Sequence, residues 1–99
     1  MHMGFVQIIE FRSGNLDAML GIEEQWEKAT EGKRTAGRRL MCRDRKDPNR
    51  YFNLVFFDSH ESAMENSDLA ETQRFSQEMM KFADGPPTFY DLDIIDDRS

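Results

Sequence analysis

Residues 51–75 read YFNLVFFDSHESAMENSDLAETQRF. The first seven residues of this stretch are apolar except for Asn53. A strand that is covered on both faces loses the usual alternation of apolar and polar side chains, so this run predicts a central strand over 51–57. From residue 58 onward the residues are mostly polar, and their pattern is typical of helices.

Two helix starts follow the strand. Asp58 and Glu61 have the spacing of a capping box, which predicts a helix from Asp58 through about Asn66. Asp68 and Glu71 repeat this spacing, so we expect a kink and a second helix. The second helix carries an apolar stripe and is ended by DGPP at 84–87; the stripe consists of Phe75, Met79, Phe82 and Ala83.

The chain before residue 51 contributes a strand and a helix. Residues 5–11 are apolar at most positions of both faces, which predicts a second central strand. Asn15 is a suitable N-cap for a helix that runs to about Thr30 and stops at Gly32. Its apolar positions recur at spacings of three and four and are Leu16, Met19, Leu20, Ile22, Trp26 and Ala29. Its charged positions are expected on the solvent-exposed side and are Glu23, Glu24, Glu27 and Lys28.

Two further strands have the mixed patterns of sheet edges. Residues 35–43 mix charged and apolar side chains, and the turn at 47–49 links them to the central strand at 51–57. Residues 88–95 alternate apolar and acidic side chains. The order strand, helix, strand, strand, helix, strand predicts an α+β, ferredoxin-like antiparallel sheet with its helices on one face, formed by a single domain over 4–96.

This fold leaves one face of the sheet without helices. The two central strands nevertheless carry apolar side chains on both faces. Leaving several of them in water would cost on the order of several kcal/mol at about 25 cal/mol per Å², which is comparable with the whole stability of a small domain. The simplest cover is a second copy, so we expect a homodimer formed through the sheet faces.

Composition excludes several classes of partner. The chain has 99 residues and a net charge of −6, which argues against nucleic acid because a polyanion is bound by a basic surface. Basic residues do cluster from Lys33 to Arg50, either as a solvated edge or as a rim that attracts an anionic ligand. No apolar run has transmembrane length and no signal peptide is evident, so we expect no membrane partner. The single cysteine, Cys42, fits the cytoplasm and is expected to be buried in its strand.

Several residues are candidates for a ligand pocket. Gln7 and Asn53 are polar positions in apolar strands, so they either bond other residues of the chain or orient a polar ligand. Trp26 is either part of the core or, with the stripe of the last helix, a pocket wall. His60 is either a solvated first-turn residue or a base. Arg39, Tyr51 and Tyr90 are further candidates for hydrogen bonds to a phenol or carbonyl. No His or Cys pair shares a helix face at ligand spacing, so no metal site is expected.

The order strand, Asp/Ser cap, short helix, polar kink and Phe-bearing helix in residues 51–75 resembles the dimeric α+β barrel superfamily, in its antibiotic-biosynthesis-monooxygenase-like branch. The resemblance implies a homodimer whose two sheets form a barrel, with a small cavity between sheet and helices in each subunit. Some such proteins are cofactor-independent oxygenases of aromatic, polyketide-like or quinol molecules. Others degrade haem with an Asn, a Trp and a His around the iron.

The resemblance also bears on cofactors. Many relatives place a His just before the kink, where this chain has Asn66. Trp26, the only Trp, lies in the first helix, and residues 61–99 contain no His. We therefore expect no haem and no other cofactor. Two functions are favoured over isomerase or decarboxylase chemistry and purely structural roles. One is a cofactor-independent monooxygenase, and the other is a non-catalytic dimer that binds a small apolar or aromatic molecule or a protein.

Overall fold

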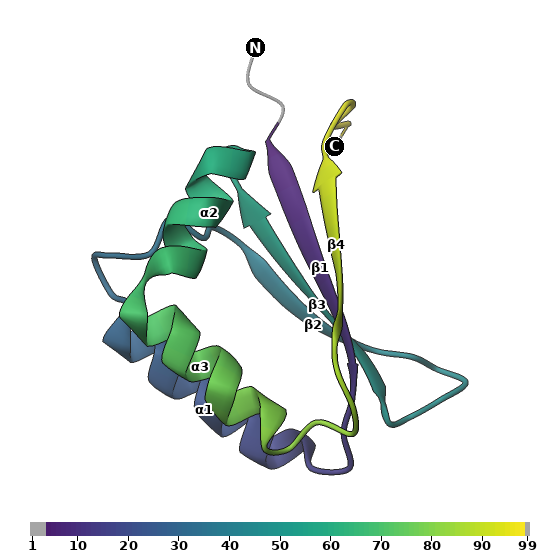
Figure 1. Ribbon diagram of the computed structural model, residues 1–99. Coiled ribbons are helices and arrows are strands. Elements are labelled where there is room, and N and C mark those ends of the chain that lie inside the picture. The colour runs from purple at the N-terminus through teal and green to yellow at the C-terminus, as the bar shows by residue number, and fades with distance from the viewer. Residues whose placement is uncertain (1–3, 99) are drawn as a thin grey trace.

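The computed structural model describes residues 4–98 (Figure 1). Three helices and four strands follow one another in the predicted order. They are β1 (Phe5–Arg12), α1 (Leu16–Ala29), β2 (Arg39–Arg43), β3 (Arg50–Phe57), α2 (His60–Asp68), α3 (Ala70–Met80) and β4 (Thr88–Asp93).

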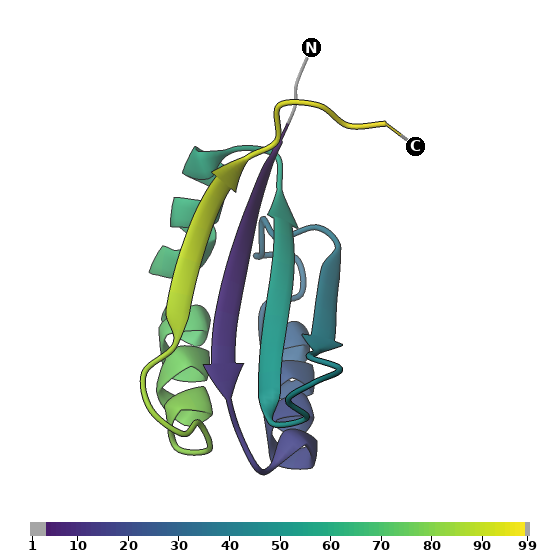
Figure 2. The same cartoon turned by 90° about the vertical axis from the view of Figure 1, so that its right-hand side faces the viewer.

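The strands form one antiparallel sheet in the order β2-β3-β1-β4. The prediction that β1 and β3 are central and that the other two strands are edges is confirmed. All three helices lie on one face of this sheet, and Figure 2 views the opposite face with the helices behind it. The α+β ferredoxin-like fold expected from the sequence is therefore present.

The two faces of the sheet differ in burial. Along β3, the odd-numbered residues are buried beneath the helices, whereas the even-numbered ones are only half-buried. The covered face holds two clusters of core side chains. One gathers Phe5, Val55, Phe57 and Ala63, and the other gathers Phe11, Met19 and Tyr51.

The uncovered face carries a continuous row of large side chains. Leu40, Leu54, Ile8 and Tyr90 lie opposite one another on the four strands. Tyr90 is 42% exposed. Cys42 lies on β2 with the same parity as Leu40 and is exposed, so the expectation of a buried thiol is wrong. The reason is that β2 is an edge strand and this face has no helical cover.

The ends of the helices refine the sequence prediction. Asn15 caps α1, its side chain accepting a hydrogen bond from the N–H of Ala18, as predicted. The capping-box interpretation of Asp58 is wrong by one residue, because the side chain of Ser59 accepts the N–H of Ser62 and α2 begins at His60. The predicted break between α2 and α3 is confirmed at Leu69, whose backbone is extended.

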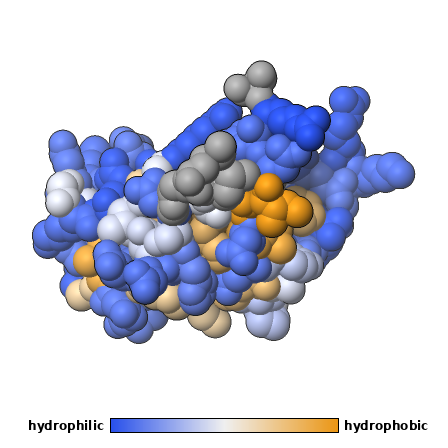
Figure 3. Space-filling model, turned by 90° about the horizontal axis from the view of Figure 1, so that it is seen from above, coloured by the Kyte–Doolittle hydropathy of each residue, from blue (hydrophilic) through white to orange (hydrophobic). Residues whose placement is uncertain are grey.

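The end of the molecule where both termini lie is shown in Figure 3. It is mostly hydrophilic, with apolar side chains gathered in a smaller area. None of the helices in the described part of the chain combines the length and apolar character required to cross a bilayer.

Candidate functional site

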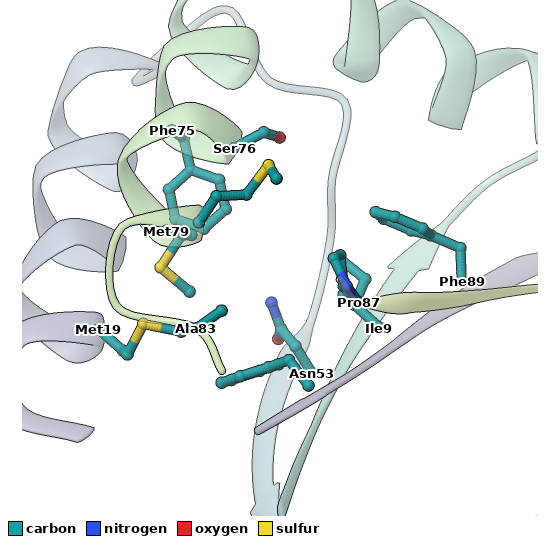
Figure 4. A pocket seen from close by; sticks show the side chains of 11 residues that line it. Ile9, Met19, Asn53, Phe75, Ser76, Met79, Ala83, Pro87 and Phe89 are labelled. Carbon is teal, nitrogen blue, oxygen red and sulfur yellow. The ribbon is translucent and has the colours of Figure 1, made fainter. Parts of the chain in front are cut away.

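A cavity of about 230 Å³ lies between the sheet and the helices (Figure 4). Its walls come from β1, β3, β4, α1, α3 and the segment between α3 and β4. Nearly all of the lining side chains are apolar, and we call this cavity the apolar chamber. Its lining residues are Ile9, Phe11, Met19, Asn53, Phe75, Ser76, Met79, Met80, Ala83, Pro87 and Phe89.

Helix α3 contributes one wall of this space. Its backbone lies beside α1 and α2, and its Met79 packs against the core cluster of Phe11, Met19 and Tyr51. Phe75 and Met79 point from it toward the sheet, and Figure 4 shows the Asn53 amide reaching up between Met79 and Pro87. Met80 and Phe89 are 60% and 56% exposed, so they mark where the chamber meets solvent.

A second, smaller space of about 60 Å³ adjoins the first. The two share four wall residues, namely Ile9, Asn53, Phe75 and Ser76. The other walls of the smaller space are mostly polar, and we call it the polar chamber. They are Glu23, Trp26, Arg39, Val55, Asn66 and Thr72.

Four buried polar atoms, on residues that line the polar chamber, have no hydrogen-bond partner within residues 4–98. They are Oε2 of Glu23, Nη1 of Arg39, Oδ1 of Asn53 and Oδ1 of Asn66. Asn53 and Asn66 are 4% and 6% exposed. Buried side-chain polar atoms are nearly always paired in folded proteins. Four unpaired atoms on the walls of one small space therefore mark a place where a polar group from outside the chain, water included, can form hydrogen bonds.

Glu23 and Arg39 give this chamber its charge. Nε of Arg39 lies 3.9 Å from Oε1 of Glu23, and its Nη2 donates to Oε2 of Glu27 at 2.8 Å. The guanidinium also lies over the ring of Trp26, 4.9 Å from the centroid. Burial raises the pKa of the Glu23 carboxyl, although the positive charge of Arg39 opposes this shift.

Trp26 closes the chamber from the side of α1. Its indole Nε1 donates to Oγ1 of Thr72 at 3.0 Å, which provides the acceptor that a buried indole needs. Its ring lies against Phe75, with 5.7 Å between centroids. Trp26 is therefore a wall of the polar chamber and a link between α1 and α3.

The structure brings six of the sequence candidates together and separates the others. The six that line the two chambers are Trp26, Arg39, Asn53, Asn66, Phe75 and Met79. Gln7 lies outside, because it donates to Oδ1 of Asp91 on the neighbouring strand at 3.1 Å. Tyr51 is buried and stacks on Phe11 instead.

The three remaining candidates also lie away from the chambers. His60 is exposed at the start of α2, with its ring edge against Phe5. Phe82 is 37% exposed just beyond α3. The hydroxyl of Tyr90 donates to Oε1 of Glu10, on the uncovered face of the sheet, at 2.9 Å.

Sequence reasoning missed Glu23, Thr72 and Ser76. The assignment of Glu23 to the wet side of α1 is wrong, since its side chain is only 17% exposed. The pattern did contain a signal: Glu23 follows Met19 by four residues and precedes Trp26 by three, which places it on the buried face of the helix. Within residues 4–98, no group of three or more His, Cys, Asp or Glu side chains is arranged to hold a metal ion.

Comparison with known proteins adds to this geometry. No family model matches the sequence, and no curated protein matches it. Solved structures do match. A proposed antibiotic biosynthesis monooxygenase from Nitrosomonas europaea superposes with a TM-score of 0.79 at 10% identity, covering 96% of this chain and 93% of that chain. The chain has the fold of the antibiotic biosynthesis monooxygenases.

Two further structures have the same fold. A proposed antibiotic biosynthesis monooxygenase from Caulobacter crescentus gives a TM-score of 0.78 at 10% identity, covering 96% of this chain and 93% of that one. SnoaB from Streptomyces nogalater, a cofactor-independent oxygenase, gives 0.71 at 9% identity, covering 88% and 90%. The similarity spans nearly the whole of each chain, so it concerns the complete domain.

Proposed function

We propose that this protein is a cytoplasmic homodimer that binds a small aromatic molecule in the apolar chamber and oxygenates it without a cofactor. The observation that carries this proposal is the junction of the two chambers at Asn53. An apolar body in the larger chamber places its polar end beside a buried amide whose Oδ1 has no partner.

The size of the apolar chamber limits the ligand. Cavities for drug-sized molecules measure about 300–1,000 Å³, whereas this one measures about 230 Å³. A compact molecule of one or two rings suits that volume. The sulfur atoms of Met19 and Met79 and the ring of Phe75 offer soft, polarisable contacts to such rings.

Oxygenation without a cofactor requires little of the protein. The substrate itself donates electrons to O₂: one oxygen atom enters the substrate, and the other leaves as water with two substrate hydrogens. The site has to bind the substrate, remove a proton, exclude water and stabilise the anion. The polar chamber offers a half-buried carboxylate, a guanidinium and two amides, and the fold shared with SnoaB agrees with this chemistry.

The uncovered sheet face supports the dimer. The row Leu40, Leu54, Ile8 and Tyr90 and the exposed Leu92 would otherwise meet water. A second copy related by a two-fold axis would cover them with the same side chains.

Oxygen uptake with 1,4-naphthohydroquinone tests the proposal, and Trp26 fluorescence reports binding. We expect uptake above the buffer rate that scales with protein, and at least a roughly tenfold loss in Asn53→Ala, because a hydrogen bond to a buried ligand is lost. Gln7→Ala is the matched control, an amide on the neighbouring central strand whose partner is Asp91, and it should behave as wild type.

The alternative is a dimer that binds such molecules without reacting with them. Nearly all residues that line the apolar chamber are apolar, which favours the binding of an aromatic molecule whether or not a reaction follows. Quenching of Trp26 without oxygen uptake would support this alternative. If neither quenching nor oxygen uptake is observed, both functions are ruled out.

A further inference from the structure

We infer that Glu23 accepts the proton of a hydroxyl group on the bound aromatic molecule, and that Arg39 stabilises the resulting oxyanion. The inference rests on the proposed function, because it requires the polar end of the ligand to enter the polar chamber. It assigns a role to a residue that sequence patterns had placed in solvent.

The geometry singles out Glu23 as the only carboxylate on this space. Of the side chains that line the polar chamber, Glu23 and Arg39 are the ones that ionise. The side chains that face them from β3, α2 and α3 are neutral, namely Asn53, Val55, Asn66, Thr72, Phe75 and Ser76. Glu27, one turn along α1, is held by Nη2 of Arg39 and does not line the chamber.

The unpaired atoms define the chemistry of the ligand. Three of them are acceptors, on Glu23, Asn53 and Asn66, and one is a donor, on Arg39. A ligand group that pairs any of the three acceptors must be a hydrogen-bond donor. A ring hydroxyl can donate to one acceptor and accept from Arg39, whereas an ether or a ketone can only accept and leaves all three acceptors unpaired.

The proton transfer balances within these groups. The ligand O–H bond breaks, and a new O–H bond forms at Oε2 of Glu23. The ligand oxygen keeps the electron pair, so the negative charge passes from Glu23 to the ligand. Nη1 of Arg39, which has no partner among the described residues, then donates to the anionic oxygen. Burial raises the pKa of Glu23 and makes it a stronger base than an exposed carboxylate.

A pair of probes that differ by one hydrogen-bond donor tests the assignment. Isothermal titration calorimetry would compare 2-naphthol with 2-methoxynaphthalene, which has a similar body but no O–H. At about pH 8 we expect wild-type protein to prefer naphthol by about tenfold, the usual effect of a hydrogen bond to a charged group. Glu23→Gln, which keeps the shape and removes the charge, should reduce the preference to about twofold or less.

Two controls separate this effect from general damage. Glu24→Gln changes a neighbouring carboxylate that is 71% exposed, and it should retain the tenfold preference. In wild-type protein the preference should also decline as the pH falls through the raised pKa of Glu23, a measurement that needs no variant.

Each outcome has a defined meaning. Equal binding of the two probes by wild-type protein, or a full preference in Glu23→Gln, would overturn the role of Glu23 and leave the proposed function standing. If neither probe binds, both the role of Glu23 and the proposed function are overturned.

Discussion

The indole N–H of Trp26 on α1 donates to Oγ1 of Thr72 on α3 at 3.0 Å. This bond joins the two helices above the sheet at the wall of the polar chamber, and it positions the only Trp of the chain beside the proposed ligand. The effects of this bond on the stability of the protein and on the fluorescence of Trp26 can both be measured.

Replacing Thr72 with Val should destabilise the protein by about 1–2 kcal/mol, because the buried indole N–H loses its acceptor. Urea unfolding followed by circular dichroism would measure the change, and Trp26 emission should shift as its environment alters. Gln73→Ala, at an exposed position next to Thr72, should change stability by less than about 0.5 kcal/mol. A Thr72→Val protein as stable as wild type would contradict the importance of this bond.

The start of α2 gives a second prediction. Ser59→Ala should cost about 1 kcal/mol, because the side chain that accepts the N–H of Ser62 is lost. Asp58→Ala removes an exposed side chain that makes no cap and should have a smaller effect. If Asp58→Ala lowered the free energy of unfolding more than Ser59→Ala does, the result would support the capping box that begins at Asp58.

The pH dependence of stability should reveal the burial of Glu23. Because burial raises its pKa in the folded state, the protonated form is favoured by folding, and this contribution is lost as the pH rises through the raised pKa. We therefore expect Glu23→Gln to gain stability relative to wild type as the pH rises from the ordinary pKa of a glutamate through the raised pKa of Glu23.

Thermal unfolding at several pH values would measure this difference. Asp47 and Glu71 have lowered pKa values through Arg12 and Lys33, so their contributions are lost as the pH falls. They are common to both proteins and cancel in the comparison. A flat difference for Glu23→Gln would mean that this carboxyl is effectively solvated.

The uncovered sheet face gives a prediction about assembly. Leu54→Asp places a charge at the centre of the row between Leu40 and Ile8, and it should convert the expected dimer into monomers, because a buried unpaired charge opposes association. Sedimentation velocity at micromolar concentration would show the change. Gln73→Asp, on the exposed side of α3, should leave the dimer intact. A wild-type protein that sediments as a monomer would refute the dimer itself.

Much of the fold could be predicted because the apolar patterns are strong. The run at 51–57 and the mostly apolar strand at 5–11 identified the central strands. The burial of single side chains was harder to predict, because it depends on which face of the sheet the helices cover. Cys42 was expected to be buried because it lies in the middle of a predicted strand, but the pattern within one edge strand does not tell which face is covered.

The candidate site was harder to predict for a related physical reason. Asn53 was noticed because an amide in an apolar strand is unusual, and Asn66 because it stands where many proteins of the resembling family place a His. Glu23 was missed because glutamate is common on solvated helix faces, and its burial depends on the contacts of α1 with the sheet and with α3. The apolar chamber is lined by side chains from three strands and two helices, so it results from tertiary packing and leaves no local pattern.

The alternating burial along β3 has a consequence for how such a protein can evolve. Positions 51, 53, 55 and 57 face the ligand side, and positions 52, 54 and 56 face the side available to another subunit. Substitutions of one parity can therefore alter what the molecule recognises while those of the other parity alter how it assembles. A single eight-residue segment thus contains two sets of positions on which selection can act separately.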